Sequence, residues 1–202
     1  YKLKLIEDCA QSFGAKRNDK YTGTFGDYGC YSFFPTKNLG CAGDGGMIVT
    51  NSKSNMRFLK KLRNHGGLIR NVHEYIGYNS RLDEIQAAIL LIKLKKINMF
   101  DKKRNAIAQQ YKSLIINNKI RLPYHAAKTH HVYNQFTICV KNRKRFSKYL
   151  DNNNIPYGIY YPIPIYRQKA LLNFKYKCFL KNTEKVAKEC ISLPMYPELT
   201  PK

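Results

Sequence analysis

The residue of this sequence that is best suited to covalent chemistry is a lysine in a glycine-rich turn. A short apolar stretch, residues 29–34, precedes the turn, and a second one, residues 47–50, follows it. This pattern predicts a strand, a turn and another strand. Lys37 lies in the turn, where neighbouring apolar and glycine residues can partly desolvate its amine. Desolvation favours the neutral amine, which can attack a carbonyl carbon.

Three other polar residues complete a set with a shared chemical use. Ser32 lies shortly before Lys37, while Asp8 ends a predicted strand near the start of the chain and Gln11 follows it. An aspartate can pair with a pyridinium nitrogen, an amide can bond near a ring oxygen, and a hydroxyl can hold a phosphate. Together with an amine that bonds an aldehyde carbon, this set suits pyridoxal phosphate (PLP). Taken singly, Asp8 could cap a strand, Ser32 could stabilise a turn and Lys37 could be an exposed loop lysine.

The order of these motifs resembles the DegT/DnrJ/StrS family of PLP-dependent nucleotide-sugar aminotransferases. The similar stretches are residues 7–15, 23–27, 32–40, 77–88, 161–164 and 193–195. The resemblance implies an α/β fold of the aspartate aminotransferase-like, type I class. Residues 1–120 would form the latter part of the PLP-binding large domain, and residues 121–202 a small α+β C-terminal domain.

The resemblance also implies roles for individual residues. Lys37 would hold PLP and act as a general base, Asp8 would keep the pyridine nitrogen protonated, and Gln11 and Ser32 would also bind the cofactor. Asn79 would reach the cofactor phosphate of a neighbouring subunit, which implies a homodimer.

A helix is predicted to begin just after Asn79. Residues 80–83 fit a capping box, and the N-terminus of a helix favours anions. Arg81 is therefore a candidate to meet a carboxylate or phosphate of the substrate, and a surface ion pair is the alternative.

The stretch Tyr160-Tyr161-Pro162-Ile163-Pro164 carries the remaining candidates. The family branch that acts on nucleotide-linked keto sugars often has His-Tyr-Pro here, so Tyr160 stands where a histidine is expected. Tyr160 and Tyr161 are candidate substrate residues, and a packing role is the alternative.

The implied reaction moves an amino group, with glutamate as the expected donor, to a keto group of a nucleotide-linked sugar. Surface polysaccharide or glycoconjugate synthesis is the implied destination. Sugar dehydratases of the family have a histidine in place of the lysine, so Lys37 argues against that chemistry. The family carries a long section before the position of Tyr1, so the alternative is a truncated, catalytically inactive remnant.

The net charge of +23 is concentrated downstream. Residues 1–50 hold six Lys/Arg against five Asp/Glu, whereas the rest of the chain holds thirty against eight. These charges could form a solvated surface, steer a nucleotide diphosphate into a cleft, or serve nucleic acid. The basic residues are scattered and lack a recognition motif, so we expect no nucleic-acid partner.

Neither a membrane nor a metal is expected. No apolar run approaches the ~20 residues that span a bilayer, and no basic-then-apolar leader is present, which favours a cytoplasmic protein. The dispersed cysteines lack a C-x-x-C pair, which argues against zinc and favours reduced thiols. They are Cys9, Cys30, Cys41, Cys139, Cys178 and Cys190.

Apolar periodicity and capping residues predict the remaining elements. Helices are expected over residues 54–65, with Ser52 or Ser54 as the cap, and over residues 101–116, 143–150, 168–172 and 183–190. Strands are expected over residues 132–140 and 157–161.

Overall fold

The computed structural model describes residues 1–174 and 180–200, and the chain forms two compact units. The first unit contains residues 1–102 and 126–134. The second contains residues 103–125 and the described residues from 135 onward. None of the helices in the described part of the chain has the length and apolar character needed to cross a bilayer.

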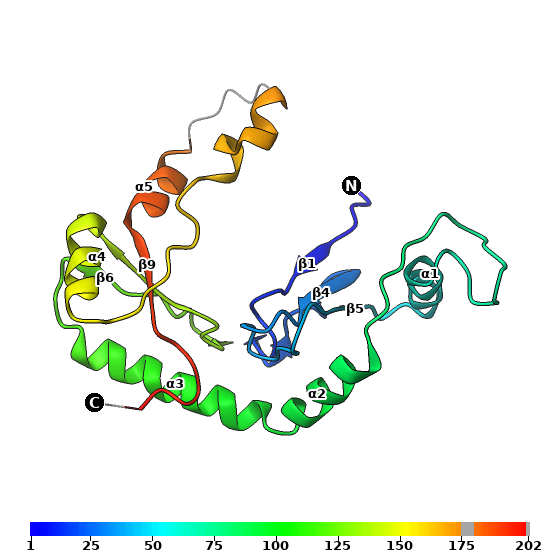
Figure 1. Cartoon of the computed structure of the whole chain (residues 1–202), viewed down its shortest axis with the longest axis horizontal. Helices are drawn as coiled ribbons and strands as arrows, with labels where there is room; N and C mark the ends of the chain where they lie inside the picture. The colour runs from blue at the N-terminus through cyan, green and yellow to red at the C-terminus, as the bar shows by residue number, and fades with distance from the viewer. Residues whose placement is uncertain (175–179, 201–202) are drawn as a thin grey trace. The chain divides into compact units, whose positions relative to one another are not determined.

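A three-stranded sheet organises the first unit (Figure 1). Its order is β1 (Ile6–Asp8), β4 (Tyr28–Ser32) and β5 (Gly46–Val49). β1 pairs with β4 in parallel, with Asp8 opposite Cys30, and β5 pairs with β4 antiparallel. The carboxyl ends of β1 and β4 therefore lie at the same edge of the sheet, and the predicted strand, turn and strand around Lys37 are confirmed.

The connection between β1 and β4 contains a hairpin in place of a helix. β2 (Lys16–Arg17) pairs with β3 (Lys20–Tyr21) on one side and with β7 (Thr129–His130) on the other. Asn18 and Asp19 form the hairpin turn with φ of 49° and 60°. Asparagine and aspartate tolerate this left-handed conformation better than other non-glycine residues, which explains their use here.

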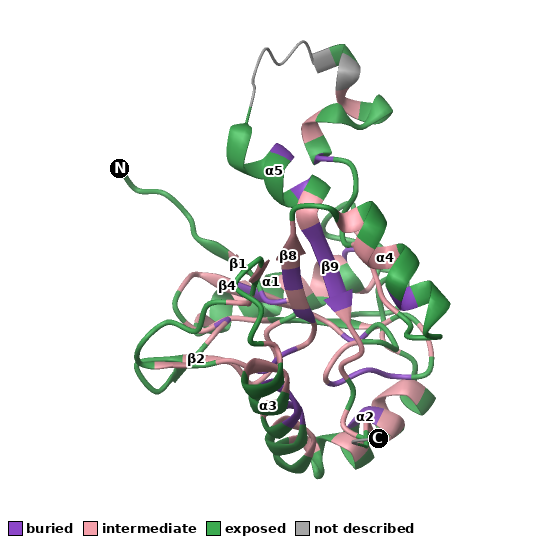
Figure 2. Ribbon diagram, turned by 90° about the vertical axis from the view of Figure 1, so that its left-hand side faces the viewer, coloured by how far each residue is buried: buried purple, intermediate pink, exposed green. Residues whose placement is uncertain are grey.

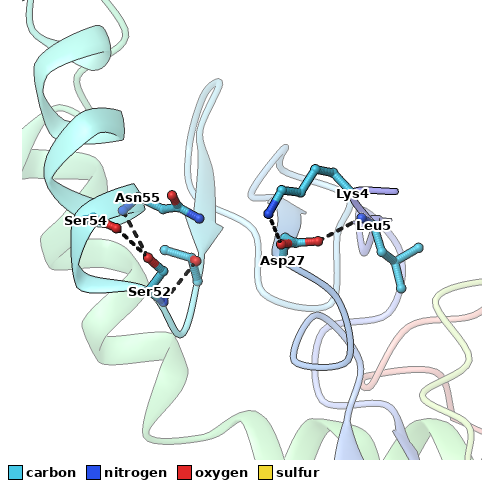
Figure 3. Close-up of polar contacts among 7 residues, drawn as sticks. Lys4, Leu5, Asp27, Ser52, Ser54 and Asn55 are labelled. Carbon is cyan, nitrogen blue, oxygen red and sulfur yellow. Dashed lines mark hydrogen bonds and ion pairs between the residues drawn. The ribbon is translucent and has the colours of Figure 1, made fainter. Parts of the chain in front are cut away.

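Helix α1 (Lys53–Arg63) follows the sheet, and Ser52 caps it as predicted. The Ser52 hydroxyl accepts a hydrogen bond from the Asn55 backbone N–H at 3.2 Å (Figure 3). Helix α3 (Ile97–Leu114) begins before the predicted residue 101 and ends close to the predicted end.

Helix α2 (Glu84–Leu94) corrects the predicted capping box. Asp83 is the cap residue but makes no side-chain capping bond, and residues 80–83 are not helical. The Ser80 N–H instead donates to the Arg63 carbonyl at 3.0 Å, which holds this segment against the end of α1. The local signal was therefore overridden by a backbone hydrogen bond to a distant residue.

The core of the first unit lies between the Lys37 turn and α2. Its buried members are Phe33, Leu39, Cys41 and Leu90. Partly buried apolar side chains that pack around this cluster are Phe13, Tyr31, Leu82 and Ile97.

The second unit is built on an antiparallel sheet with the order β6 (Ile120–Arg121), β8 (Phe136–Val140) and β9 (Cys190–Leu193). Figure 2 shows the buried positions concentrated on β8 and β9. Helices α4 (Arg143–Asn152) and α5 (Lys181–Glu189) contact β8. Two 3₁₀ helices, η1 (Ile165–Arg167) and η2 (Lys169–Phe174), precede α5.

Two strand predictions in this unit were inaccurate. The strand expected from residue 132 begins at Phe136, and residues 132–134 belong to the first unit. The strand expected over residues 157–161 is reduced to a single bridge between Gly158 and Ser192.

Glu7 ties the β1–β4 connection to the sheet. Its carboxylate accepts backbone hydrogen bonds from Gly23 at 2.7 Å, Phe25 at 2.6 Å and Gly26 at 2.7 Å. Partial burial raises the pKa of this carboxyl group, but the three N–H groups outweigh burial and lower the pKa below the ordinary glutamate value. Asp27 adds a smaller tie by accepting hydrogen bonds from Leu5 and Lys4 (Figure 3).

Replacing Glu7 by glutamine should destabilise the first unit. An amide offers one acceptor oxygen and faces at least one N–H with its own donors, so we expect a loss of about 1–3 kcal/mol. A lowered pKa gives stability that is present above the pKa of the unfolded carboxyl and is lost as pH falls through the folded pKa. Denaturant unfolding of Glu7→Gln and wild type should therefore differ at pH 7 and converge in acid. The exposed-site variant Asp19→Asn is the control, and an equal effect there would contradict the assignment.

Candidate functional site

Four of the predicted site residues gather at the carboxyl edge of the parallel pair β1–β4 or just beyond it. Asp8 ends β1, and Ser32 ends β4. The Asp8 carboxylate accepts the Ala10 N–H at 3.0 Å, which shapes the turn that exposes Gln11. In open α/β sheets ligands bind outside the carboxyl ends of the strands, so this edge is the place where the fold favours a ligand.

Lys37 extends the same edge from the turn that follows β4. The Ser32 hydroxyl accepts the Phe34 N–H at 3.3 Å, and the Lys37 N–H donates to the Phe34 carbonyl at 2.9 Å. The turn is therefore a folded structure, and Lys37 is half-buried in it.

Helix α2 holds this turn from one side. The Gln86 amide oxygen accepts the Ala42 N–H at 2.8 Å, and the Lys93 ammonium donates to the Gly40 carbonyl at 2.5 Å. Gln86 and Lys93 are seven residues apart, so they share one face of the helix.

Asn38 holds the turn from another segment. Its amide nitrogen donates to the Val132 carbonyl at 2.8 Å, while its buried amide oxygen has no hydrogen-bond partner. Sequence reasoning did not single out Asn38, Gln86 or Lys93. The seven-residue spacing of Gln86 and Lys93 could have indicated that they share one helix face. Nothing near Asn38 in the sequence indicated that its partner is Val132.

Asn79 and Arg81 lie on another segment of the first unit, beside the end of α1. Asn79 forms a backbone bridge with Asn64, and the Tyr78 N–H donates to the Leu62 carbonyl at 2.7 Å. Both side chains are exposed, and Arg81 precedes α2 instead of lying within it. Asn79 and Arg81 therefore lie in the segment that leads into α2, before its cap residue Asp83, and not in the first turn of the helix.

Close backbone contact fixes the loop that leads to Asn79. Gly66 has φ of +88°, and a Cβ there would lie 1.7 Å from the Tyr75 carbonyl oxygen. The N–H groups of Glu74 and Tyr75 both donate to the Gly66 carbonyl, at 3.0 and 3.1 Å. Only glycine fits where the backbone at residue 66 approaches the backbone of residues 74 and 75 so closely.

Tyr160 and Tyr161 belong to the second unit. They line a cavity of about 440 Å³ together with residues of α5. Their rings pack edge to face with centroids 6.0 Å apart, and both side chains are largely exposed.

A buried carboxylate anchors the segment that follows these tyrosines. Glu184 on α5 is 7% exposed, and its Oε1 lies 2.5 Å from the Arg167 Nε. The Tyr166 hydroxyl donates to the same oxygen. This anchor positions the cavity wall and does not by itself constitute a binding group.

No group of three potential metal ligands occurs among the described residues. The arrangement at the β1–β4 edge offers an amine, a carboxylate, a hydroxyl and an amide. These groups suit an organic cofactor with a ring and a phosphate.

Solved structures with the same fold are aminotransferases. A DegT/DnrJ/EryC1/StrS aminotransferase from Brucella abortus has a TM-score of 0.92 and 37% identity, over 98% of this chain and 53% of its own. NtdA from Bacillus subtilis, solved with bound cofactor PMP, has a TM-score of 0.86 and 32% identity, over 99% of this chain and 47% of its own. The mixed α/β fold thus places the chain in an aminotransferase class.

Sequence comparison gives the family. Residues 1–202 match the DegT/DnrJ/EryC1/StrS aminotransferase family, and the chain belongs to it. The UDP-N-acetyl-3-dehydro-α-D-glucosamine 3-aminotransferase of Acidithiobacillus ferrooxidans is 43% identical over 98% of this chain and 53% of its own length. The dTDP-3-amino-3,6-dideoxy-α-D-galactopyranose transaminase of Aneurinibacillus thermoaerophilus is 42% identical over 99% of this chain and 55% of its own length. The chain spans about half the length of these relatives.

Removing the Gln86 amide should loosen the Lys37 turn. We expect Gln86→Ala to lower the free energy of unfolding by about 0.5–1 kcal/mol, because the hydrogen bond to the Ala42 N–H is lost. Hydrogen exchange at the Ala42 N–H should accelerate. The exposed α3 variant Gln110→Ala is the control, and unchanged exchange at Ala42 in Gln86→Ala would disprove the role of this contact.

Gly66→Ala should disrupt the loop that carries Asn79. A Cβ meets backbone there, and the positive φ adds strain, so we expect a loss of more than about 1 kcal/mol. Faster exchange at the Tyr78 N–H would report the disruption directly. Gly43→Ala is the matched control, since its Cβ would meet only the flexible end of the Gln86 side chain, at 3.2 Å. Equal stability losses in both variants would contradict the prediction.

Proposed function

We propose that this chain carries the PLP-binding and substrate residues of a nucleotide-sugar aminotransferase. The observation that carries the proposal is the placement of Asp8, Ser32 and Lys37 on the carboxyl side of the parallel strands β1 and β4. Family membership and the sugar transaminases among the relatives support the reaction class.

The residues at this edge fit PLP in their donor and acceptor chemistry. The Asp8 carboxylate, exposed at a strand end, can hold a proton on the pyridine nitrogen. The Ser32 hydroxyl can bond the phosphate, and the Gln11 amide can bond near the ring oxygen. The half-buried Lys37 amine can bond the aldehyde carbon.

When bound, PLP supplies a ring that withdraws electrons from the substrate carbon that loses a proton. Lys37 Nζ would take this proton as a general base and return it as a general acid. Asp8 would hold the proton of the pyridine nitrogen. The hydrogen bonds of Gln86 and Lys93 hold the Lys37 turn in place while the amine acts.

The other candidate residues define the proposed substrates and assembly. Asn79 acts across a homodimer interface on the cofactor phosphate of the partner subunit. Arg81 meets a carboxylate or phosphate, and Tyr160 and Tyr161 contact the sugar. Residues 1–120 are assigned to the large domain and residues 121–202 to the small one.

The proposed reaction transfers an amino group from glutamate to a keto group of a nucleotide-linked sugar in the cytoplasm, for surface polysaccharide or glycoconjugate synthesis. The downstream positive charge would attract the nucleotide diphosphate. The transaminase relatives, which carry UDP- and dTDP-sugar names, support this substrate class.

PLP labelling tests the proposal on this chain. The protein is incubated with PLP, reduced with borohydride and digested, and the pyridoxyl group is located by peptide mass. We expect label on Lys37 that disappears in Lys37→Ala and persists in Lys53→Ala, an exposed lysine of α1. Circular dichroism checks that each variant folds. Label spread over many lysines, or none on folded protein, would overturn the assignment.

A further inference from the structure

Two cysteines lie directly opposite each other on neighbouring strands of the second unit. Cys139 of β8 pairs with Cys190 of β9 in the antiparallel register. Opposite residues in such a pair have Cα atoms about 4.5–5.5 Å apart, within the range of about 4.4–6.8 Å that a disulfide requires. Both cysteines are free thiols in the structure.

The side chains of these cysteines point to the same face of the sheet. Thr137 and Ser192 form the pair two residues further along, and their hydroxyl oxygens are 2.8 Å apart. Side chains alternate between faces with a period of two, so Cys139 and Cys190 share the face on which these hydroxyls meet.

The two thiols have different surroundings. Cys139 is partly exposed, and the Arg121 guanidinium donates to its sulfur at 3.2 Å. Cys190 is 2% exposed, and burial raises the pKa of its thiol, although Arg143 opposes this effect. Arg143 also donates to the Cys190 carbonyl at 3.2 Å. Cys139 is therefore the accessible thiol and Cys190 the protected one.

We propose that Cys139 and Cys190 form a reversible cross-strand disulfide, which makes this pair a redox-modification site. The oxidant is a small disulfide such as oxidised glutathione. The thiolate is the attacking species in such exchanges. The Cys139 sulfur is the accessible one of the pair and lies beside the Arg121 guanidinium, so it reacts first.

The exchange takes place in two balanced steps. The Cys139 thiolate attacks one sulfur of oxidised glutathione, a mixed disulfide forms, and one glutathione thiolate leaves. The Cys190 thiolate, its proton released to solvent, attacks the Cys139 sulfur, and the second glutathione thiolate leaves. Two protein thiols are oxidised, and one glutathione disulfide is reduced to two thiols. Reduced glutathione reverses both steps.

The disulfide has a structural consequence at the tyrosine cavity. The Cys190 Sγ donates to the Tyr160 carbonyl at 3.7 Å, and Cys190 is one of the residues that line the cavity with Tyr160 and Tyr161. Bonding this sulfur to Cys139 removes the S–H donor and changes how the Tyr160 segment is held. An effect on sugar binding rests on the proposed function, whereas the disulfide itself does not.

Redox titration of the 202-residue protein tests the proposal. The protein is equilibrated in buffers of varied oxidised-to-reduced glutathione ratio, free thiols are alkylated, and non-reduced digests are analysed by mass. We expect a peptide linking Cys139 to Cys190 that increases with the ratio and disappears on return to reduced glutathione. Hydrogen exchange in the peptide containing Tyr160 should change in parallel.

Single substitutions give distinct outcomes. Cys190→Ser should keep glutathione on Cys139 as a stable mixed disulfide, because the second thiol is missing. Cys139→Ser should abolish the link. In this variant glutathione uptake at Cys190 should be at least tenfold slower than uptake at Cys139 in Cys190→Ser, because the Cys190 sulfur is buried. Cys30→Ser, on β4 of the first unit, is the control and should leave the link intact.

Three results would overturn the proposal, and none depends on PLP binding or enzymatic activity. The first is that folded wild-type protein gives no linked peptide at any ratio. The second is that Cys139 or Cys190 pairs preferentially with a different cysteine. The third is that Cys139 and Cys190 take up glutathione at equal rates. The wild-type digest decides the matter even if Cys190→Ser fails to fold.

Discussion

The parallel pairing of β1 with β4 is the constraint on which the candidate site depends. Parallel neighbours require a long return connection, and here residues 9–27 make it without a helix. Such a connection exposes backbone N–H groups that need partners. Glu7 accepts three of them with one carboxylate, so the charge that stabilises the connection also fixes the strand that carries Asp8.

The Lys37 turn is held in place without regular secondary structure. Phe33 and Leu39 of this segment pack with Leu90 of α2 in the buried apolar cluster, which holds the turn against the helix. Hydrogen bonds from Gln86 and Lys93 satisfy backbone groups that the turn leaves unpaired. The role proposed for Lys37 requires supporting groups that are already in place, and the contacts of α2 supply them.

The second unit is stabilised in a different way from the first. Its sheet is antiparallel, and its buried positions concentrate on the central strand β8 and on β9. Glu184 anchors the segment after the tyrosines through Arg167, while the Cys139–Cys190 pair lies at the junction of sheet and cavity. Cys190 of β9 therefore belongs both to the cysteine pair and to the lining of the cavity.

The sequence by itself determined the strand and turn around Lys37, the cap of α1 and most helices, because these features depend on local propensity and short-range hydrogen bonds. The ordered motifs were also sufficient to predict the family, which the comparisons confirm. Tertiary structure decided where α2 begins, because the Ser80 N–H bonds to Arg63 instead of starting a helix. It also decided the roles of Asn38 and Gln86 and the pairing of Cys139 with Cys190. The contacts of Asn38 and Gln86 and the cysteine pair join residues more than forty positions apart, and no local pattern encodes which distant partner a side chain will meet.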